Sequence, residues 1–309
     1  MADPLGLVLL LALPVVVVVA AGLTVSADAA LSREGGRAPL LEVARLLVGQ
    51  RRRTPSDDDV LGRLGTTLLP VVAVLAAAVV PLGARPAVDL DVGVVWFNAM
   101  EVLAWVAVWT AGWGPNSAIS LVGGYRGIVQ GLAYELPHMF AIITPAIAAG
   151  SLRVTDVVSA QDGLWFAVWM PVAFVLYLVS AAAMAFWGPF DAPLGRELAG
   201  GASAEHAGVD RLLLVAGRWM LLTVAAAFAV PLFLGGPMPL PGLGPLSHGG
   251  PAWAWVWVAG KTVVVLAALL LARRALPTLR MERFASFAWV VLLPLGVAQT
   301  LVVSLVVIS

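Results

Sequence analysis

Cysteine and charge are what this sequence has least of. The 309-residue chain contains no cysteine, and only 12% of its residues are charged. Without cysteine it cannot form disulfides, thiolate nucleophiles or cysteine-ligated iron–sulfur clusters. Its three histidines, His138, His206 and His248, lie far apart and have no metal-ligand spacing. The 18 basic and 18 acidic residues cancel, so the charge balance does not indicate a nucleic-acid partner.

Apolar residues are abundant instead. They make up 61% of the chain, whereas a soluble domain has roughly 45–50% apolar and about 25% charged residues. This composition excludes an ordinary water-soluble enzyme and also a disordered chain. A membrane-spanning helix needs roughly 20 mainly apolar residues, so we mark candidate spans by the gaps between charges. We expect an all-α, polytopic membrane protein with one integral membrane domain over residues 1–309 and eight helices, near 5–26, 64–84, 93–112, 121–149, 163–190, 212–234, 253–273 and 284–309.

Three further segments need a separate interpretation. The first apolar stretch lacks a basic n-region and a small-residue cleavage site, which favours a mature helix over a signal peptide. Segment 235–251 is apolar but full of glycine and proline, so it is predicted to be a loop. Segment 38–50 interleaves apolar residues with Glu42 and Arg45, which indicates a short amphipathic helix at the membrane surface.

The basic residues predict the orientation in the membrane. Thirteen of the 18 lie in or beside three loops, near 27–62, 188–211 and 274–284. Because basic loops stay in the cytoplasm, these three are expected to be cytoplasmic and both termini to face outward.

Ionisable residues inside predicted spans are the first functional candidates. Each costs several kcal/mol unless it is paired or hydrated. These residues are Glu101, Arg126, Glu135, Arg218 and Lys261. A structural ion pair between helices is the alternative explanation, and Glu101 with Arg218 or with Lys261 is a candidate pair.

The span near 121–149 is the richest in polar residues. Arg126, Gln130 and Tyr134 recur every four residues, so they share one stripe of the helix. Glu135 lies about 180° around the helix from Arg126 and roughly 14 Å deeper, so the two cannot pair. Pro137 leaves a backbone carbonyl free nearby, and with His138 this group could hold ordered water. The pattern suits a proton relay, and a hydrogen-bonded helix-packing site is the alternative.

The loop near 188–211 concentrates acidic residues on the side where basic residues prevail, namely Asp191, Glu197, Glu205 and Asp210. They suit a docking surface or the wall of a polar cavity, with a solvated loop as the alternative. Spacing alone leaves three function classes open: a proton- or ion-conducting subunit, a substrate transporter and a structural anchor. A transporter usually shows an internal repeat, and we find none.

A series of short motifs resembles a known family. They occur in the order Ala111-Gly112-Trp113, Asn116, Leu121-Val122-Gly123, Arg126, Gln130, Tyr134-Glu135, Ala149-Gly150-Ser151-Leu152, Asp156, Pro189-Phe190-Asp191, Pro193, Glu197-Leu198, Glu205, Gly208, Phe233 to Gly236, Lys261-Thr262, Arg273, Pro277, Arg280, Glu282, Trp289 and Pro294. This order and spacing resembles the H subunit (subunit 1) of the proton-pumping NADH:quinone oxidoreductase, complex I. The resemblance covers residues from about 89 to 309, and 38–83 more loosely.

The resemblance implies a role within a larger complex. In that family the subunit has eight helices with outward termini and binds no cofactor of its own. It joins the membrane arm to the peripheral arm, and with two peripheral subunits it encloses the chamber for quinone, the substrate of the complex. Intramembrane glutamates lead from the chamber towards antiporter-like subunits. We therefore expect a bacterial inner-membrane subunit that helps couple electron transfer to proton translocation.

The resemblance also assigns candidate residues. For the proton path these are Glu135, Arg126 and Tyr134 of the motif in the 121–149 span. Glu101, Lys261 and Arg218 join them as proton-path candidates because they are charges inside predicted spans. For the quinone chamber or subunit docking they are Asp191, Glu197, Glu205, Arg273 and Arg280.

Some positions depart from the family pattern. The Glu-Arg and Arg-x-Gly-Pro motifs of the first loop are absent, and Arg218 stands where the family has a glutamate. Membrane anchors of respiratory-type nickel–iron hydrogenases share the fold and also lack that first-loop motif. A hydrogenase anchor is therefore one alternative, and an unrelated transporter is another.

Overall fold

The described part of the chain is built from helices and loops and contains no strand. The computed structural model describes residues 4–33, 37–195, 200–239 and 251–308. This confirms the all-α prediction. The α-helices are α1 (Pro4–Leu31), α2 (Ala38–Val48), α3 (Asp59–Ala77), α4 (Gly93–Trp113), α5 (Ala118–Ala149), α6 (Val154–Ser159), α7 (Phe166–Trp169), α8 (Pro171–Met184), α9 (Gly208–Phe233), α10 (Pro251–Ala275), α11 (Met281–Phe287) and α12 (Leu293–Ile308).

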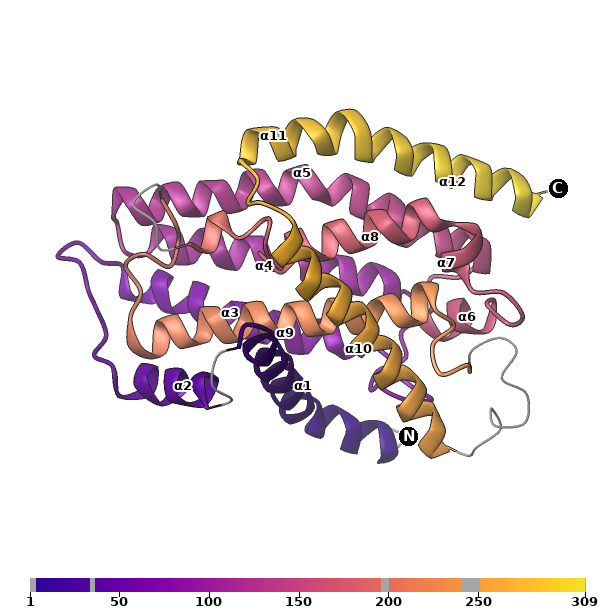
Figure 1. Ribbon diagram of the computed structural model, residues 1–309, viewed down its shortest axis with the longest axis horizontal. Helices are drawn as coiled ribbons and strands as arrows, with labels where there is room; N and C mark the ends of the chain where they lie inside the picture. Colours follow the sequence, from indigo (N-terminus) through magenta and orange to yellow (C-terminus); the bar gives the residue numbers. More distant parts are fainter. Residues whose placement is uncertain (1–3, 34–36, 196–199, 240–250, 309) are drawn as a thin grey trace.

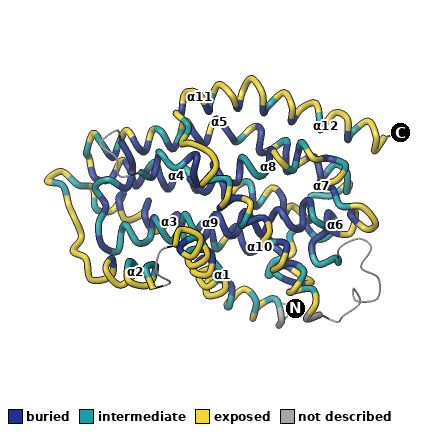
Figure 2. Tube along the Cα trace, in the orientation of Figure 1, coloured by how far each residue is buried: buried dark blue, intermediate teal, exposed yellow. Residues whose placement is uncertain are grey.

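The long helices form a bundle that lies along the longest axis of the molecule (Figure 1). Helices α3, α4, α5 and α9 occupy its centre, whereas α1, α10 and α12 lie on the outside, where much of their surface is exposed (Figure 2). Within the described residues, seven helices are long and apolar enough to span a membrane. The exposed residues of the outer helices are largely leucine and valine, as expected for surfaces that face lipid. The chain is therefore a multi-pass membrane protein.

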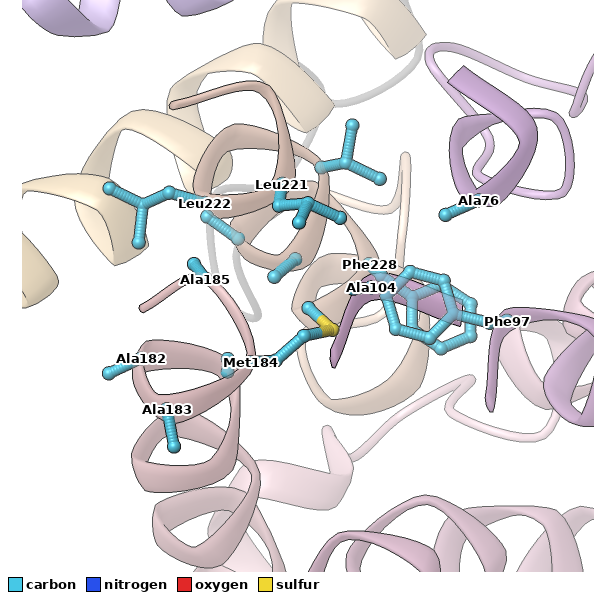
Figure 3. Close-up of a cluster of buried hydrophobic side chains, with 14 of the residues drawn as sticks. Ala76, Phe97, Ala104, Ala182, Ala183, Met184, Ala185, Leu221, Leu222 and Phe228 are labelled. Atoms are coloured by element: carbon cyan, nitrogen blue, oxygen red, sulfur yellow. The ribbon is translucent and has the colours of Figure 1, made fainter. Parts of the chain in front are cut away.

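Helix α9 forms the core of the bundle. Every residue from Met220 to Phe233 is buried. The ring of Phe228 stacks on Phe97 of α4 with centroids 3.8 Å apart (Figure 3). The hydroxyl of Tyr177 on α8 donates a hydrogen bond to the carbonyl of Ala225 over 2.7 Å. Helix α9 thus fixes both α4 and α8.

Glycines let α3, α4 and α5 approach closely. A Cβ atom added to Gly65 of α3 would lie 2.2 Å from the backbone nitrogen of Ala111 on α4. A Cβ atom on Gly112 would lie 2.8 Å from the Cα atom of Gly124 on α5. Small residues at such contacts are typical of membrane helix pairs, because packing and not water exclusion holds them together.

The span predicted at 163–190 is broken in the structure. The segment forms the one-turn helix α7 and the 14-residue helix α8, which are separated by Met170. Met170 has φ −125° and ψ 57° because the ring of Pro171 disfavours a helical residue before it. At a rise of about 1.5 Å per residue, α8 is roughly 21 Å long, which is shorter than a hydrocarbon core of about 30 Å.

Two other predicted spans also begin or end at different residues in the structure. The second span begins at Asp59, where the Asp58 side chain caps the helix by accepting a hydrogen bond from the Leu61 amide over 3.0 Å. It ends at Ala77, so the predicted helical residues 78–84 are a buried non-helical segment. The last span begins earlier than predicted, at Met281, and runs through a π-helical turn (Ala288–Leu292) into α12. A gap between charged residues shows only that a segment is apolar, so it does not locate the residues at which a helix begins and ends.

The two ends of the bundle carry different short helices. Helix α2 confirms the predicted short helix, and its buried Leu46 lies towards α9 while most of its other leucines are exposed. Both termini lie towards the end of the bundle that carries α6 and α7, and α2 and the start of α9 lie towards the opposite end (Figure 1).

Candidate functional site

The polar stripe of α5 holds the loop that precedes α9. Arg126 donates from Nη1 to the carbonyl of Gly200 over 2.7 Å. The buried amide of Gln130 donates to the carbonyls of Ala183 and Phe190 over 2.7 and 3.0 Å. Arg126 therefore satisfies a carbonyl of the loop before α9, and Gln130 satisfies one carbonyl in the last turn of α8 and one in the segment that follows it.

Glu101 of α4 lies beside His138 of α5. His138 Nε2 and Glu101 Oε2 are 2.7 Å apart, and the two side chains are 0% and 1% exposed. The candidate pairing of Glu101 with Arg218 or Lys261 is therefore wrong. The sequence does not contain the register between α4 and α5, which decides which residue meets Glu101. The sequence places His138 in the polar group around Glu135, one turn from Tyr134, but it gives no sign that His138 pairs with Glu101.

Two further α5 residues adjoin this pair along the helix. Tyr134 is one turn before His138 and completely buried, and its hydroxyl has no hydrogen-bond partner among the described residues. Glu135 is half-buried, three residues before His138. The structure thus brings Glu101, Tyr134 and His138 together, with Glu135 one helical turn from His138.

Lys261 of α10 caps the end of α9. Its ammonium donates to the carbonyls of Leu234, Gly236 and Met238 over 2.6, 2.9 and 2.6 Å. It also lies 4.2 Å from the centre of the Trp165 ring. A cation at the carboxyl end of a helix satisfies free carbonyls and complements the helix dipole, so these contacts hold α10 against the loop after α9.

Arg218 and Arg273 both contact a buried tryptophan. Their guanidinium carbons lie 5.1 and 4.4 Å from the ring centre of Trp187, which is completely buried. Arg273 is also 3.3 Å from one carboxylate oxygen of Asp28 on α1, and Arg274 is 2.8 Å from the other. This cluster links α1, α9 and α10 at their ends near the predicted cytoplasmic loops.

The predicted cytoplasmic segments 27–62 and 188–211 contact each other. Glu205 lies 3.7 Å from Arg52 and accepts a hydrogen bond from Ser117 over 3.0 Å, and Asp210 lies 3.5 Å from Arg51. Of the other candidates, Asp191 begins a short 3₁₀ turn, Arg280 is exposed just before α11, and Glu197 lies outside the described residues.

A cavity of about 580 Å³ lies between α1, α2 and α9. Its lining is mainly apolar, and its polar side chains include Ser26, Asp28, Glu42 and Trp219. A second, apolar cavity of about 390 Å³ lies between α1, α9 and α10. No group of three or more histidine, aspartate or glutamate side chains suited to a metal ion occurs among the described residues.

Comparison with known proteins decides the family. The profile of the family described as NADH dehydrogenase matches residues 29–304. The chain belongs to this family. It is 33% identical to an NADH-quinone oxidoreductase H subunit of Geobacter metallireducens over 85% of the chain and 80% of that protein. It is 31% identical to the NADH-quinone oxidoreductase H subunit of Geobacillus kaustophilus over 88% of the chain and 82% of that protein.

Membership of this family confirms the resemblance found in the sequence. It makes the chain a homologue of complex I membrane subunits, and the alternative of an unrelated transporter is wrong. The matched residues include α2 to α11 and most of α12, so the loop contacts and the buried pair lie in the family region, whereas the part of the cavity lining that α1 contributes up to Asp28 precedes it.

Proposed function

We propose that this chain is the membrane subunit of a complex I-like NADH:quinone oxidoreductase that forms part of the quinone chamber. The observation that carries this proposal is the cavity between α1, α2 and α9. In a bacterial inner membrane it would take quinone from the bilayer. The electron donors would reside in the partner subunits, and this chain would bind no redox cofactor.

The cavity has the chemistry that a quinone requires. A quinone joins an apolar tail to a ring with two carbonyl oxygens, so its site must be largely apolar with a few polar groups. Residues such as Val18, Ala21 and Val25 of α1 supply apolar lining. Asp28 and Glu42 lie on the part of the lining formed by the end of α1 and by α2, next to the predicted cytoplasmic loops.

The loops support docking of partner subunits. The pairs Arg51–Asp210 and Arg52–Glu205 join the predicted cytoplasmic segments 27–62 and 188–211. These arginine side chains keep a large exposed fraction, 41% for Arg51 and 65% for Arg52. We assign peripheral-arm subunits to this charged end, with Asp191, Glu197, Arg273 and Arg280 as further docking or chamber candidates. Antiporter-like subunits would bind the lipid-facing side of the bundle.

The proton path would use the carboxylates of α4 and α5. Glu135 and Glu101 lie on adjacent helices, and His138, which contacts Glu101, is one helical turn from both Glu135 and Tyr134. Lys261 and Arg126 donate to backbone carbonyls, and Arg218 contacts Trp187. These contacts favour supporting roles for the three basic residues and a proton-carrying role for the acidic pair.

A cavity-filling variant tests the quinone site. Gly22 lines the cavity, and a Cβ atom there would have no neighbour within 4 Å, so Gly22→Phe fills the space without a backbone clash. We expect the KM for quinone to rise about tenfold, because one badly placed group in an apolar pocket costs about 1–3 kcal/mol. The measurement is quinone-reductase kinetics of the purified complex.

The matched control is Gly260→Phe. Gly260 of α10 is also open, but it lies outside the cavity lining. An unchanged KM in both variants would contradict the quinone site.

The subunit composition of the purified complex distinguishes this proposal from the remaining alternative, a hydrogenase anchor. NADH-module and antiporter-like subunits identified by mass spectrometry support the proposal. Recovery of a hydrogenase large subunit would replace it by the hydrogenase anchor.

A further inference from the structure

An acid–base pair is enclosed at the centre of the bundle. Glu101 and His138 come from different helices, are 2.7 Å apart, and are almost completely shielded. Neither the second carboxylate oxygen of Glu101 nor His138 Nδ1 has a hydrogen-bond partner among the described residues. The close contact between Nε2 and Oε2 also lacks the angles of a hydrogen bond. A purely structural pair is expected to satisfy its buried polar atoms better than this.

The polar atoms around the pair lie on one side. Tyr134 precedes His138 by one turn on α5, and its buried hydroxyl is unpartnered. The Tyr177 ring on α8 lies 5.3 Å from the His138 ring, and one turn further Ser180 has a buried, unpartnered hydroxyl. Unpartnered hydroxyls beside an imidazole and a carboxylate are the groups that bind internal water.

The other elements bring no second counter-charge to the pair within the described part of the chain. Glu135 on α5 and the phenols of Tyr134 and Tyr177 are the neighbouring titratable groups. Helix α9 faces this region with the apolar Ala225 and Phe228, and α12 has no ionisable residue between Leu293 and Ile308. The ionisable residues of α3 are Asp59 and Arg63. Both lie in its first two turns, which pack near the carboxyl-terminal end of α4 and away from Glu101.

We propose that Glu101 and His138 form a proton-relay pair between α5 and α4. His138 exchanges a proton with water at Nδ1 and with Glu101 at Nε2. In the inner step the N–H bond at Nε2 breaks and an O–H bond forms at Oε2. The proton moves from one partner to the other, so the total charge of the pair is unchanged. Because no net charge is created in the interior, the step avoids the cost of an isolated buried ion.

The inference rests on the proposed function for its part in coupling, but proton binding by the pair does not. Infrared difference spectra between acid and alkaline pH, recorded on the purified complex, test binding without turnover. We expect a protonated-carboxyl band that Glu101→Gln removes. His138→Gln should shift the pH midpoint of that band by about one unit or more, a typical effect of removing a charged partner.

Two further variants make the test specific. Thr110→Val changes a buried α4 residue whose hydroxyl bonds only carbonyls of its own helix, and it should leave the band and midpoint unchanged. If Glu101→Gln does not assemble, Glu101→Asp keeps the carboxyl but shortens its reach, and it should shift the midpoint. In reconstituted vesicles, proton pumping by Glu101→Gln should fall to about a tenth or less, as for the loss of an acid–base group.

The outcomes separate the two proposals. A band that survives unaltered in Glu101→Gln, or a midpoint unaffected by His138→Gln, overturns the relay pair. If the band depends on both residues but the wild-type complex neither reduces quinone nor pumps protons, the pair stands and the proposed function fails. If the wild-type complex pumps and the band is independent of both residues, only the pair fails.

Discussion

At the scale of single residues, the contacts of a buried charge separate structural roles from chemical ones. Lys261 and Glu101 both lie in predicted spans, and sequence gives them equal weight. The structure shows Lys261 with three carbonyl acceptors, whereas Glu101 has a titratable partner and an unpartnered oxygen. Saturated hydrogen bonding favours a fixed cation, and unsatisfied groups favour a site that exchanges protons.

The role of Lys261 leads to a stability prediction. Lys261→Met keeps much of the side chain but leaves the carbonyls of Leu234, Gly236 and Met238 without their donor. Each buried group left unsatisfied costs about 1–3 kcal/mol, so the Tm of the solubilised complex should fall. Turnover and pumping per assembled complex should be nearly unchanged. Lys261→Arg is the control that keeps the charge. A stable Lys261→Met complex that cannot pump would instead assign Lys261 to the proton path.

The sequence revealed which residues are costly to bury, but not their partners. Apolar surroundings alone identify Glu101, Arg218 and Lys261 as unusual. Their neighbours depend on the rotation and sliding of α4, α9 and α10, which the spacing along one helix does not contain. The pairing of His138 with Glu101 therefore becomes visible only in the folded structure. The same holds for the hydrogen bond from Arg126 to Gly200 in the loop before α9.

At the scale of helices, hydropathy predicts membrane helices well and their breaks poorly. Long, mainly apolar runs predicted α1, α9 and α10 because lipid requires continuous apolar surface. The break before α8 depends on the ring of Pro171 and not on hydropathy. The non-helical residues 78–84 are equally apolar, so composition could not distinguish them from a helix.

The contact between α3 and α4 gives a prediction at this scale. Gly65→Val places a branched side chain where even a Cβ atom would lie 2.2 Å from the Ala111 backbone. The helices must separate, which should cost about 3 kcal/mol or more, at or beyond the upper end for overpacking. The amount of chain recovered in the assembled complex, measured by immunoblot of native gels, should fall sharply. Gly260→Val on the open face of α10 is the control, and equal recovery of both variants would contradict tight α3–α4 packing.

At the scale of the whole molecule, polar interactions at the predicted cytoplasmic end tie distant segments together. The carboxylate of Glu205 contacts the segment after α2 through Arg52 and the start of α5 through Ser117. His206 Nε2 lies 2.9 Å from the Ala111 carbonyl at the end of α4. These contacts join the segment after α2, the end of α4 and the start of α5 to the loop before α9 in one polar network.

Charge reversal tests whether this polar network docks subunits. Glu205→Arg should weaken binding of the peripheral subunits by about tenfold or more, because an unpaired charge at an interface is costly. The loss of subunits can be measured by native mass spectrometry. Asp89→Arg is the control, since Asp89 is an acidic residue in the loop before α4, beside Arg153. A solvated loop with an exposed ion pair contributes about 1 kcal/mol or less, so unchanged stoichiometry would support that simpler role.

The break in the predicted span at 163–190 also has a consequence for biogenesis. The insertion machinery meets 28 consecutive uncharged residues at 163–190, more than enough to enter the bilayer as one unit. The finished protein keeps only 14 of them in α8, and Gln130 bonds carbonyls at Ala183 and Phe190. Since bare backbone cannot remain in lipid, we expect the segment to reach its final shape only when it packs against α5, whose Gln130 satisfies those carbonyls.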